Sequence, residues 1–301
     1  MVFGLLPIGC QALKMSNSTY TLTNGDATAV INLVGSALVG LRFGNHVVIP
    51  ETDLGPKTYA GALLTPWPNR ISKGRYAFEG NEYQLEIRDG LGNALHGLVD
   101  ESTGEIVETS AGFLKLATSV EGAPGYPARL LVEATFELSA SELVVSYFVT
   151  NTGSSNAPVG IGTHPYFPFG DSTTVEVNAK TAAVHGTDML PISNIPSSEI
   201  GLGAGTKALV ADLQLDTQFT GVTNPVATLV TDGVALDIWS ESADWLMIYT
   251  TNKFPWASGQ GNAIAIEPQT CPADAFNTGE DLRVLAPGES TSMRFGLRLR
   301  G

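Results

Sequence analysis

The strongest structural signal in the chain is a regular alternation of apolar and polar residues. Between Arg129 and Leu138 every second residue is apolar, and the residues between them are mostly charged or polar. Residues 293–300 repeat the pattern, with Met, Phe and Leu at alternate positions and Arg or Gly between them. A period of two places the apolar side chains of a β-strand on one face. Both segments are therefore predicted to be strands with one buried face.

Strand patterns recur along the rest of the chain. They are found at residues 143–150, 227–231, 234–239, 246–250 and 263–266. Residues 74–85 carry two aromatic-bearing runs around Glu79-Gly80-Asn81, which predicts a hairpin whose glycine has positive φ. No segment has the periodicity of a long amphipathic helix, and only residues 207–215 are predicted to form a short one. With 33 Gly and 17 Pro, the chain is predicted to be all-β, a sandwich of antiparallel sheets.

The N-terminal residues differ from the rest. Residues 1–15 are apolar, lack the basic start of a secretory signal and are too few to span a bilayer. We expect them to be a loosely ordered extension, followed by a single domain over residues 16–301. The longest uncharged apolar stretch elsewhere, residues 27–41, is interrupted by Asn, Ser and Gly. No membrane helix is predicted, and we expect a soluble protein.

Charge and cysteine content exclude several classes of partner. The 16 Lys and Arg against 30 Asp and Glu give 16 − 30 = −14, which disfavours binding to nucleic acid or to an anionic membrane. Cys10 and Cys271 are far apart and have no CxxC spacing, so neither a disulfide framework nor a thiolate zinc site is predicted. We interpret both as free thiols in a reducing compartment, the cytoplasm.

Common catalytic motifs are missing from the sequence. It contains no GxSxG, no GxxxxGK[ST] and no HExxH. The glycine-rich residues 201–205 lack the spacing and the βαβ context of a dinucleotide loop, so a turn is predicted there.

Polar residues in unusual settings are the remaining candidates for chemistry. In Pro66-Trp-Pro-Asn-Arg-Ile71, two prolines stiffen the chain around Trp67, Asn69 and Arg70. The alternatives are a rigid loop whose arginine makes an ordinary ion pair, and a tryptophan that belongs to the core. His96 stands at a glycine-rich turn, and His164 is held extended by the following proline. Either histidine could instead be structural.

Two carboxylates complete the candidate set. Glu267 ends an apolar strand, and burial would raise its pKa toward the range of a general base. A structural glutamate paired with Arg70 would look the same in sequence. Asp216 lies between apolar neighbours, although aspartate at a turn is common. A histidine acid and a glutamate base, with polar residues to orient the substrate, form a metal-free proton-transfer set that suits a polyhydroxy compound.

Taken in order, these segments resemble the aldose 1-epimerase (galactose mutarotase) family, and a bacterial subgroup in particular. The resemblance extends from about Thr23 to Leu299. It is carried by NRI, the GRYAFEG hairpin, NALHG, THPYF, LDTQF, EPQTCPADAFN and LAPGES.

The resemblance implies a β-supersandwich domain that interconverts the α and β anomers of a free hexose without a cofactor or a metal. It implies that Glu267 is the general base and His164 the general acid. By the same resemblance, the substrate-orienting residues are Arg70, His96 and Asp216, with Asn69 and Gln269 as weaker companions. Trp67 is a further candidate, for stacking on the apolar face of the sugar.

Three alternatives stay open. A hexose-6-phosphate mutarotase would need basic residues aimed at a phosphate, and the chain has few. A carbohydrate-binding or sensing domain would keep the pocket but would not need a matched acid and base. A glycoside hydrolase could use Glu267 and Asp216 as its carboxylate pair. The sequence does not predict which sugar is preferred or whether the protein is a monomer.

Overall fold

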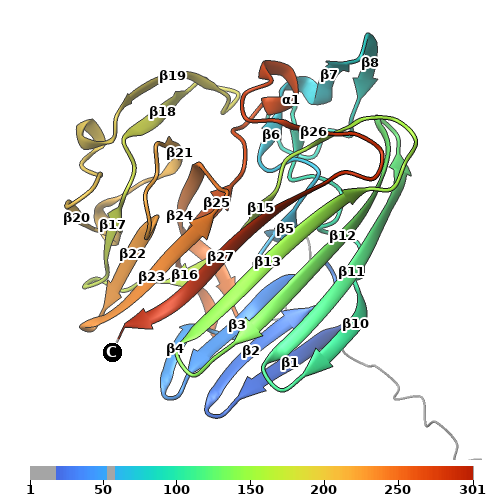
Figure 1. The fold of residues 1–301 in the computed structure, drawn as a ribbon. Coiled ribbons are helices and arrows are strands. Elements are labelled where there is room, and N and C mark those ends of the chain that lie inside the picture. The colour runs from blue at the N-terminus through green and yellow to red at the C-terminus, as the bar shows by residue number, and fades with distance from the viewer. Residues whose placement is uncertain (1–17, 53–57, 301) are drawn as a thin grey trace, which may run out of the picture.

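The computed structural model describes residues 18–52 and 58–300, so the predicted extension at residues 1–15 lies outside the described part of the chain. The described residues form three sheets and three two-stranded ribbons, and their paired strands are antiparallel (Figure 1). The prediction of an all-β sandwich is confirmed. The division into an extension and one domain stays a prediction.

The largest sheet has nine strands in the described residues and runs across the front of Figure 1. Its spatial order is β10 (Glu105–Ser110), β11 (Phe113–Ala123), β12 (Tyr126–Leu138), β13 (Glu142–Asn151), β27 (Ser290–Arg300), β23 (Val234–Glu241), β22 (Ala227–Thr231), β17 (Thr174–Val177) and β20 (Lys207–Leu209).

The second sheet carries the candidate site. Its order is β19 (Pro191–Pro196), β18 (Thr181–His185), β21 (Asp216–Thr220), β24 (Trp245–Trp256), β25 (Gly259–Gln269), β15 (Gly162–Thr163) and β5 (Leu63–Leu64), with β16 (Tyr166–Pro168) also paired to β25. An N-terminal sheet consists of β1 (Thr19–Asn24), β2 (Ala27–Asn32), β3 (Ala37–Phe43) and β4 (His46–Ile49).

The remaining elements are short. The ribbons are β6 (Arg70–Ile71) with β9 (Ala94–Leu95), β7 (Arg75–Phe78) with β8 (Asn81–Gln84), and β14 (Ala157–Val159) with β26 (Arg283–Leu285). The helical elements include α1 (Ala275–Thr278) and 3₁₀ turns at Ser72–Gly74, Ser197–Ile200 and Val210–Asp212. Among the residues described, no helix has the length and apolarity needed to cross a membrane.

The core lies between the sheets and is built by the predicted alternation. On β12 the five alternate residues from Leu130 to Leu138 are at most 4% exposed, as predicted. Met293, Phe295 and Leu297 of β27 are equally buried, and Leu299 packs against the same cluster. This cluster also includes the inward side chains of β2, β3, β24 and β25, so the nine-stranded sheet shares one core with the other two sheets.

The local predictions had mixed outcomes. The β7–β8 hairpin is confirmed, with Glu79 and Gly80 both at positive φ (48° and 79°). The short helix predicted over residues 207–215 is wrong. Lys207–Leu209 instead pairs with β17 at the edge of the nine-stranded sheet, and a 3₁₀ turn follows. Cross-strand hydrogen bonds satisfy this backbone better than a helix too short to be stable alone.

Candidate active site

One face of the eight-stranded sheet carries the candidate carboxylates. Asp216 on β21 lies opposite Tyr249 on β24, and Gln218 lies opposite Met247, which in turn faces Glu267 on β25. Opposed residues of an antiparallel sheet point to the same side. We call the side that carries these five residues the site face.

The intervening residues point the other way. Phe219 on β21, Ile248 on β24 and Ile266 on β25 all belong to the main core cluster. The alternation that buries one face of this sheet in the core therefore also places Asp216 and Glu267 together on the opposite face, although 50 residues of sequence separate them.

Asn69 and His96 contribute a second wall of the site and are held by each other. They flank the β6–β9 ribbon, where Arg70 pairs with Leu95, and both have left-handed backbones (φ 57° and 60°). The backbone N–H of His96 donates to the Asn69 carbonyl (3.0 Å), and the Asn69 N–H donates to His96 Nδ1 (3.2 Å). Glycine is required at Gly97, since an added Cβ would lie 2.2 Å from the Thr65 carbonyl oxygen.

The His96 ring is a neutral hydrogen-bond donor. Its Nδ1 accepts the Asn69 N–H, so the neutral ring carries its proton on Nε2. Burial lowers the pKa of His96 well below its usual range, and the nearby His164, Arg70 and Arg88 lower it further. At neutral pH His96 therefore has one N–H left to donate and no charge.

His164 and Glu267 are in direct contact. His164 lies between β15 and β16, where its N–H donates to the Ala62 carbonyl (3.2 Å) and its carbonyl accepts from Gly61 (2.8 Å). Its Nε2 is 3.3 Å from Glu267 Oε1. The ring stacks on Tyr166 with centroids 4.8 Å apart, and its edge contacts His96 at 5.2 Å. The predicted acid and base thus form one pair.

Burial disfavours charge on both members of this pair. His164 is 5% exposed and Glu267 is 1% exposed. Burial raises the pKa of Glu267 well above its usual range, and the Asp216 charge raises it further, while Gln269 and Arg70 oppose the shift. Burial also lowers the pKa of His164, to about 3. The Gln269 Nε2 donates to Glu267 Oε2 (3.2 Å), so both carboxyl oxygens of the glutamate are in contact with a side chain.

Arg70 reaches toward the site face but is not paired with Glu267. Its Nε donates to Asp89 (3.1 Å), and its Nη2 is 3.8 Å from Asp216 Oδ2. The alternative of a structural glutamate ion-paired with Arg70 is therefore wrong. Burial opposes ionisation of Asp89, but hydrogen bonds from Asn93, Leu91 and Arg70 outweigh it and lower the pKa of this carboxyl. Asp89 stays ionised and holds the guanidinium.

Trp67 belongs to the core. It is 2% exposed and packs against Tyr126 (6.3 Å between centroids) and Phe276 (5.7 Å). The expectation that its indole stacks on a sugar is wrong, because both prolines beside it are buried as well and the ring faces other aromatics. Of the two alternatives for this tryptophan, a residue that stacks on the sugar and a residue of the core, the structure supports the second.

Several residues near the site were not predicted. Asp89 was missed, although an aspartate before a Gly-Leu-Gly-Asn turn is a known turn-capping signal. Tyr59 packs on His96 (4.6 Å), and Tyr166 stacks on His164. His185 is half-buried, and the charges of Asp216 and Arg70 both act on it. Apart from the turn signal at Asp89, no local pattern reveals these neighbours, because they come from segments that are far apart in the sequence.

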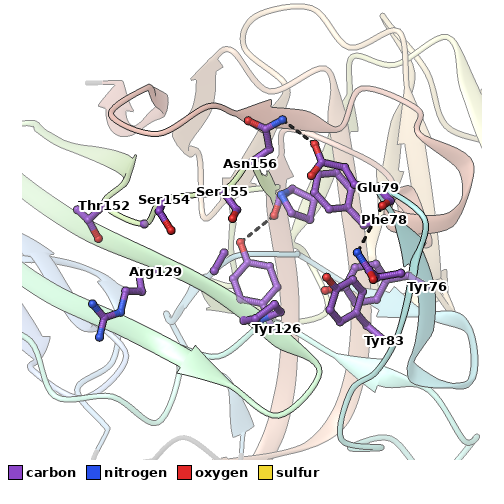
Figure 2. Close-up of a pocket in the computed structure, with 15 residues that line it drawn as sticks. Tyr76, Phe78, Glu79, Tyr83, Tyr126, Arg129, Thr152, Ser154, Ser155 and Asn156 are labelled. Atoms are coloured by element: carbon purple, nitrogen blue, oxygen red, sulfur yellow. Dashed lines mark hydrogen bonds between the residues drawn. The ribbon is translucent and has the colours of Figure 1, made fainter.

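Two hollows of the structure differ in their position relative to the site. A groove of about 640 Å³ is lined by Asp216 and Tyr249 and continues to Lys253, so it adjoins the site face. Figure 2 shows a different hollow of about 610 Å³, where Tyr76, Tyr83 and Tyr126 lie below a polar rim. It contains none of the candidate site residues. Across the described ranges, no group of three or more His, Cys, Asp or Glu side chains is placed to hold a metal ion.

Comparison with known proteins gives consistent results. Residues 18–298 match the model of the aldose 1-epimerase family. A protein of Escherichia coli K12 named YihR, itself uncharacterised, is 30% identical over 97% of this chain and 98% of its own length. Bovine galactose mutarotase is 31% identical over 68% of this chain and 62% of its own length.

Solved structures show the same fold. A proposed aldose 1-epimerase from Escherichia coli K12 superposes with a TM-score of 0.83 at 25% identity, covering 94% of this chain and 98% of that one. An aldose epimerase homologue from Caenorhabditis elegans also has a TM-score of 0.83, at 17% identity, over 95% of this chain and 99% of that one. The second likeness concerns the fold alone.

Proposed function

The chain belongs to the aldose 1-epimerase family, and on that premise we propose that it is a mutarotase, an isomerase that interconverts the α and β anomers of a free hexose. The observation that carries the proposal is the buried contact of 3.3 Å between His164 Nε2 and Glu267 Oε1. In a cyclic aldose, the C1 hydroxyl oxygen and the ring oxygen are bonded to the same carbon. An acid and a base that serve these two atoms must therefore lie side by side, as this pair does.

Ring opening begins with two proton transfers. The Glu267 carboxylate takes the proton of the C1 hydroxyl while protonated His164 gives a proton to the ring oxygen. The bond between C1 and the ring oxygen breaks, and its electron pair stays on that oxygen, which becomes a hydroxyl. Carbon 1 becomes an aldehyde. Rotation about the C1–C2 bond then presents its other face, and reversal of both transfers closes the ring as the other anomer.

The burial of the pair fits this cycle. Before ring opening the pair holds one transferable proton, on His164. Afterwards it again holds one, on Glu267, because the glutamate has received a proton and the histidine has given one away. The protein therefore exchanges no net proton with water. Since burial raises the pKa of Glu267 and lowers that of His164, it favours the uncharged pair that exists in the ring-opened state. This preference assists the step that breaks the ring.

The surrounding polar groups orient the sugar. Arg70 and the His96 Nε2–H are donors, and Asp216 is an acceptor, at the rim of the site face. Asn69 supports this wall through its carboxamide oxygen, which accepts from the Arg70 backbone N–H (2.9 Å). Gln269 positions the base. Held hydroxyl groups convert a loose encounter into a defined geometry, which supplies much of the rate.

Charge pairing supports a free sugar over a sugar phosphate. Arg70 is bound to Asp89 and lies near Asp216, and Arg88 is bound to Asp100 (2.7 Å) and Glu101 (3.1 Å). The charges of both arginines are thus largely compensated within the protein, whereas a phosphate site needs donors that are free to bind it. We also propose a reducing compartment, the cytoplasm, which the buried free thiol of Cys271 supports.

The test is the rate of anomer exchange on freshly dissolved α-D-glucose and α-D-galactose, followed by polarimetry or NMR, with their 6-phosphates alongside. We expect acceleration on at least one free sugar, little on the phosphates, and a loss of about 10²- to 10⁴-fold in kcat for Glu267→Gln. Binding of the sugar without acceleration would instead support a sensing domain. Faster exchange on the 6-phosphates would favour the phosphate-specific enzyme.

A further inference from the structure

The β18 strand brings a third histidine toward the site face. Thr181 and Ala182 on β18 lie opposite Thr220 and Phe219 on β21. Continued by three residues, this antiparallel register sets His185 opposite Asp216. Alternation agrees, because Ala182 and Phe219 belong to the core cluster, and His185 is an odd number of residues from Ala182. Its side chain therefore projects from the site face.

The turn that follows His185 is fastened to the residues that hold Arg70. Asn93 Nδ2 donates to the Asp188 carbonyl (3.0 Å) and also to Asp89 Oδ2 (3.1 Å), the same carboxyl oxygen that accepts from Arg70 Nε. Inside the turn, the Gly186 N–H donates to the Leu190 carbonyl (2.9 Å). The end of β18 is thus positioned relative to Arg70 by a continuous set of hydrogen bonds.

The His185 ring is uncharged and available. It is half-buried, and burial is the main cause that lowers its pKa; the Asp216 charge raises it and the Arg70 charge lowers it. A neutral imidazole offers one N–H donor and one acceptor nitrogen. No hydrogen bond joins this ring to another group in the described part of the chain. A hydroxyl group, which is both donor and acceptor, matches it.

The spacing of the strands places His185 across a sugar from the catalytic pair. Three inter-strand steps separate β18 from β25, about 14 Å between their backbones. This separation is sufficient for a single sugar ring to lie between His185 and the catalytic pair. If carbon 1 lies at His164 and Glu267, the opposite carbons of the ring, with their hydroxyls, lie toward β18.

We propose that His185 is a specificity-determining residue, which together with Asp216 binds the hydroxyl groups of the sugar ring remote from carbon 1. It thereby discriminates between aldoses that differ in configuration there. The inference rests on the proposed mutarotase function. Glucose and galactose, which are epimers at carbon 4, are the natural pair to compare.

The test compares His185→Ala with a matched control on the same hairpin, Ser193→Ala, whose side chain is exposed on β19. Anomer-exchange kinetics are measured on glucose, galactose and 4-deoxyglucose. We expect His185→Ala to change the glucose-to-galactose ratio of kcat/KM by roughly three- to tenfold, mainly through KM, as loss of one hydrogen bond predicts. The substitution should cost little on the 4-deoxy sugar, and Ser193→Ala should leave the ratio unchanged.

The opposite results separate the possible failures. A ratio unchanged in His185→Ala, or an equal loss on all three sugars, would overturn the role in specificity. If the wild-type protein accelerates none of the sugars, the proposed function fails instead. The contact is then tested by NMR, where a shift of the His185 ring proton on addition of glucose or galactose supports it and the absence of a shift overturns it.

Discussion

The nine-stranded and eight-stranded sheets have the same alternation of apolar and polar residues, but their polar faces lie in opposite environments. In both, one face packs into the shared core. On the other face of the nine-stranded sheet, charges meet water in cross-strand pairs, such as Glu142 opposite Arg298 with 2.9 Å between their charged groups. On the site face of the eight-stranded sheet, Glu267 is covered and 1% exposed. The polar face becomes reactive where loops exclude water, because burial shifts pKa values.

His164→Asn, a substitution at the site face, should produce the largest of the predicted effects, a fall in kcat. Asparagine keeps a polar side chain of moderate size but cannot transfer a proton to the ring oxygen, so we expect kcat to fall by about 10²- to 10⁴-fold. The KM should rise much less. Stopped-flow polarimetry across a range of sugar concentrations measures both. Wild-type activity in this variant would exclude His164 as the acid.

Phe136→Ala should affect the scaffold and leave the chemistry intact. The ring of Phe136 on β12 is fully buried in the core, and its loss should reduce the free energy of unfolding by about 3–5 kcal/mol. Urea denaturation measures this change, and kcat of the folded protein should remain near that of the wild type. If kcat fell as far as in His164→Asn, the two sheets could not be treated as separable in function.

Glu267→Gln should have a smaller effect, on stability, that depends on pH. It should show how much stability the protein loses by burying an ionisable carboxyl group in the site. Burial raises the pKa of Glu267, so the folded protein retains a proton that the unfolded chain loses near pH 4.5. The stability of the wild type is therefore full below pH 4.5 and declines as the pH rises toward the folded pKa. Glutamine cannot ionise and avoids this decline.

The measurement is the Tm of both proteins between pH 4 and pH 9. We expect the difference, glutamine variant minus wild type, to grow with pH, with each kcal/mol worth about 2–4 °C. A difference that stayed constant across this range would show that Glu267 has the same pKa in the folded and unfolded states.

Local sequence was sufficient for much of the fold and for part of the site. The strands at residues 129–138 and 293–300 were predicted with the correct inward faces, and so was the hairpin at residues 74–85. Glu267 and His164 were identified because each stands in an apolar or proline-stiffened setting. The failures concern partners. Trp67 lies in the core, Arg70 pairs with Asp89, and His185 was not recognised as a neighbour of the site.

By itself, the sequence determined which segments become strands and which side of each strand is apolar, since both follow from a period that any few neighbouring residues define. It also determined the order of the motifs that mark the family. Only the tertiary structure decided that His185, Asp216 and Glu267 share one face, and that His164 and Glu267 meet within a covered site. Cross-strand register and burial both depend on residues far away in the chain, and a local pattern carries no information about which distant strand will lie beside it.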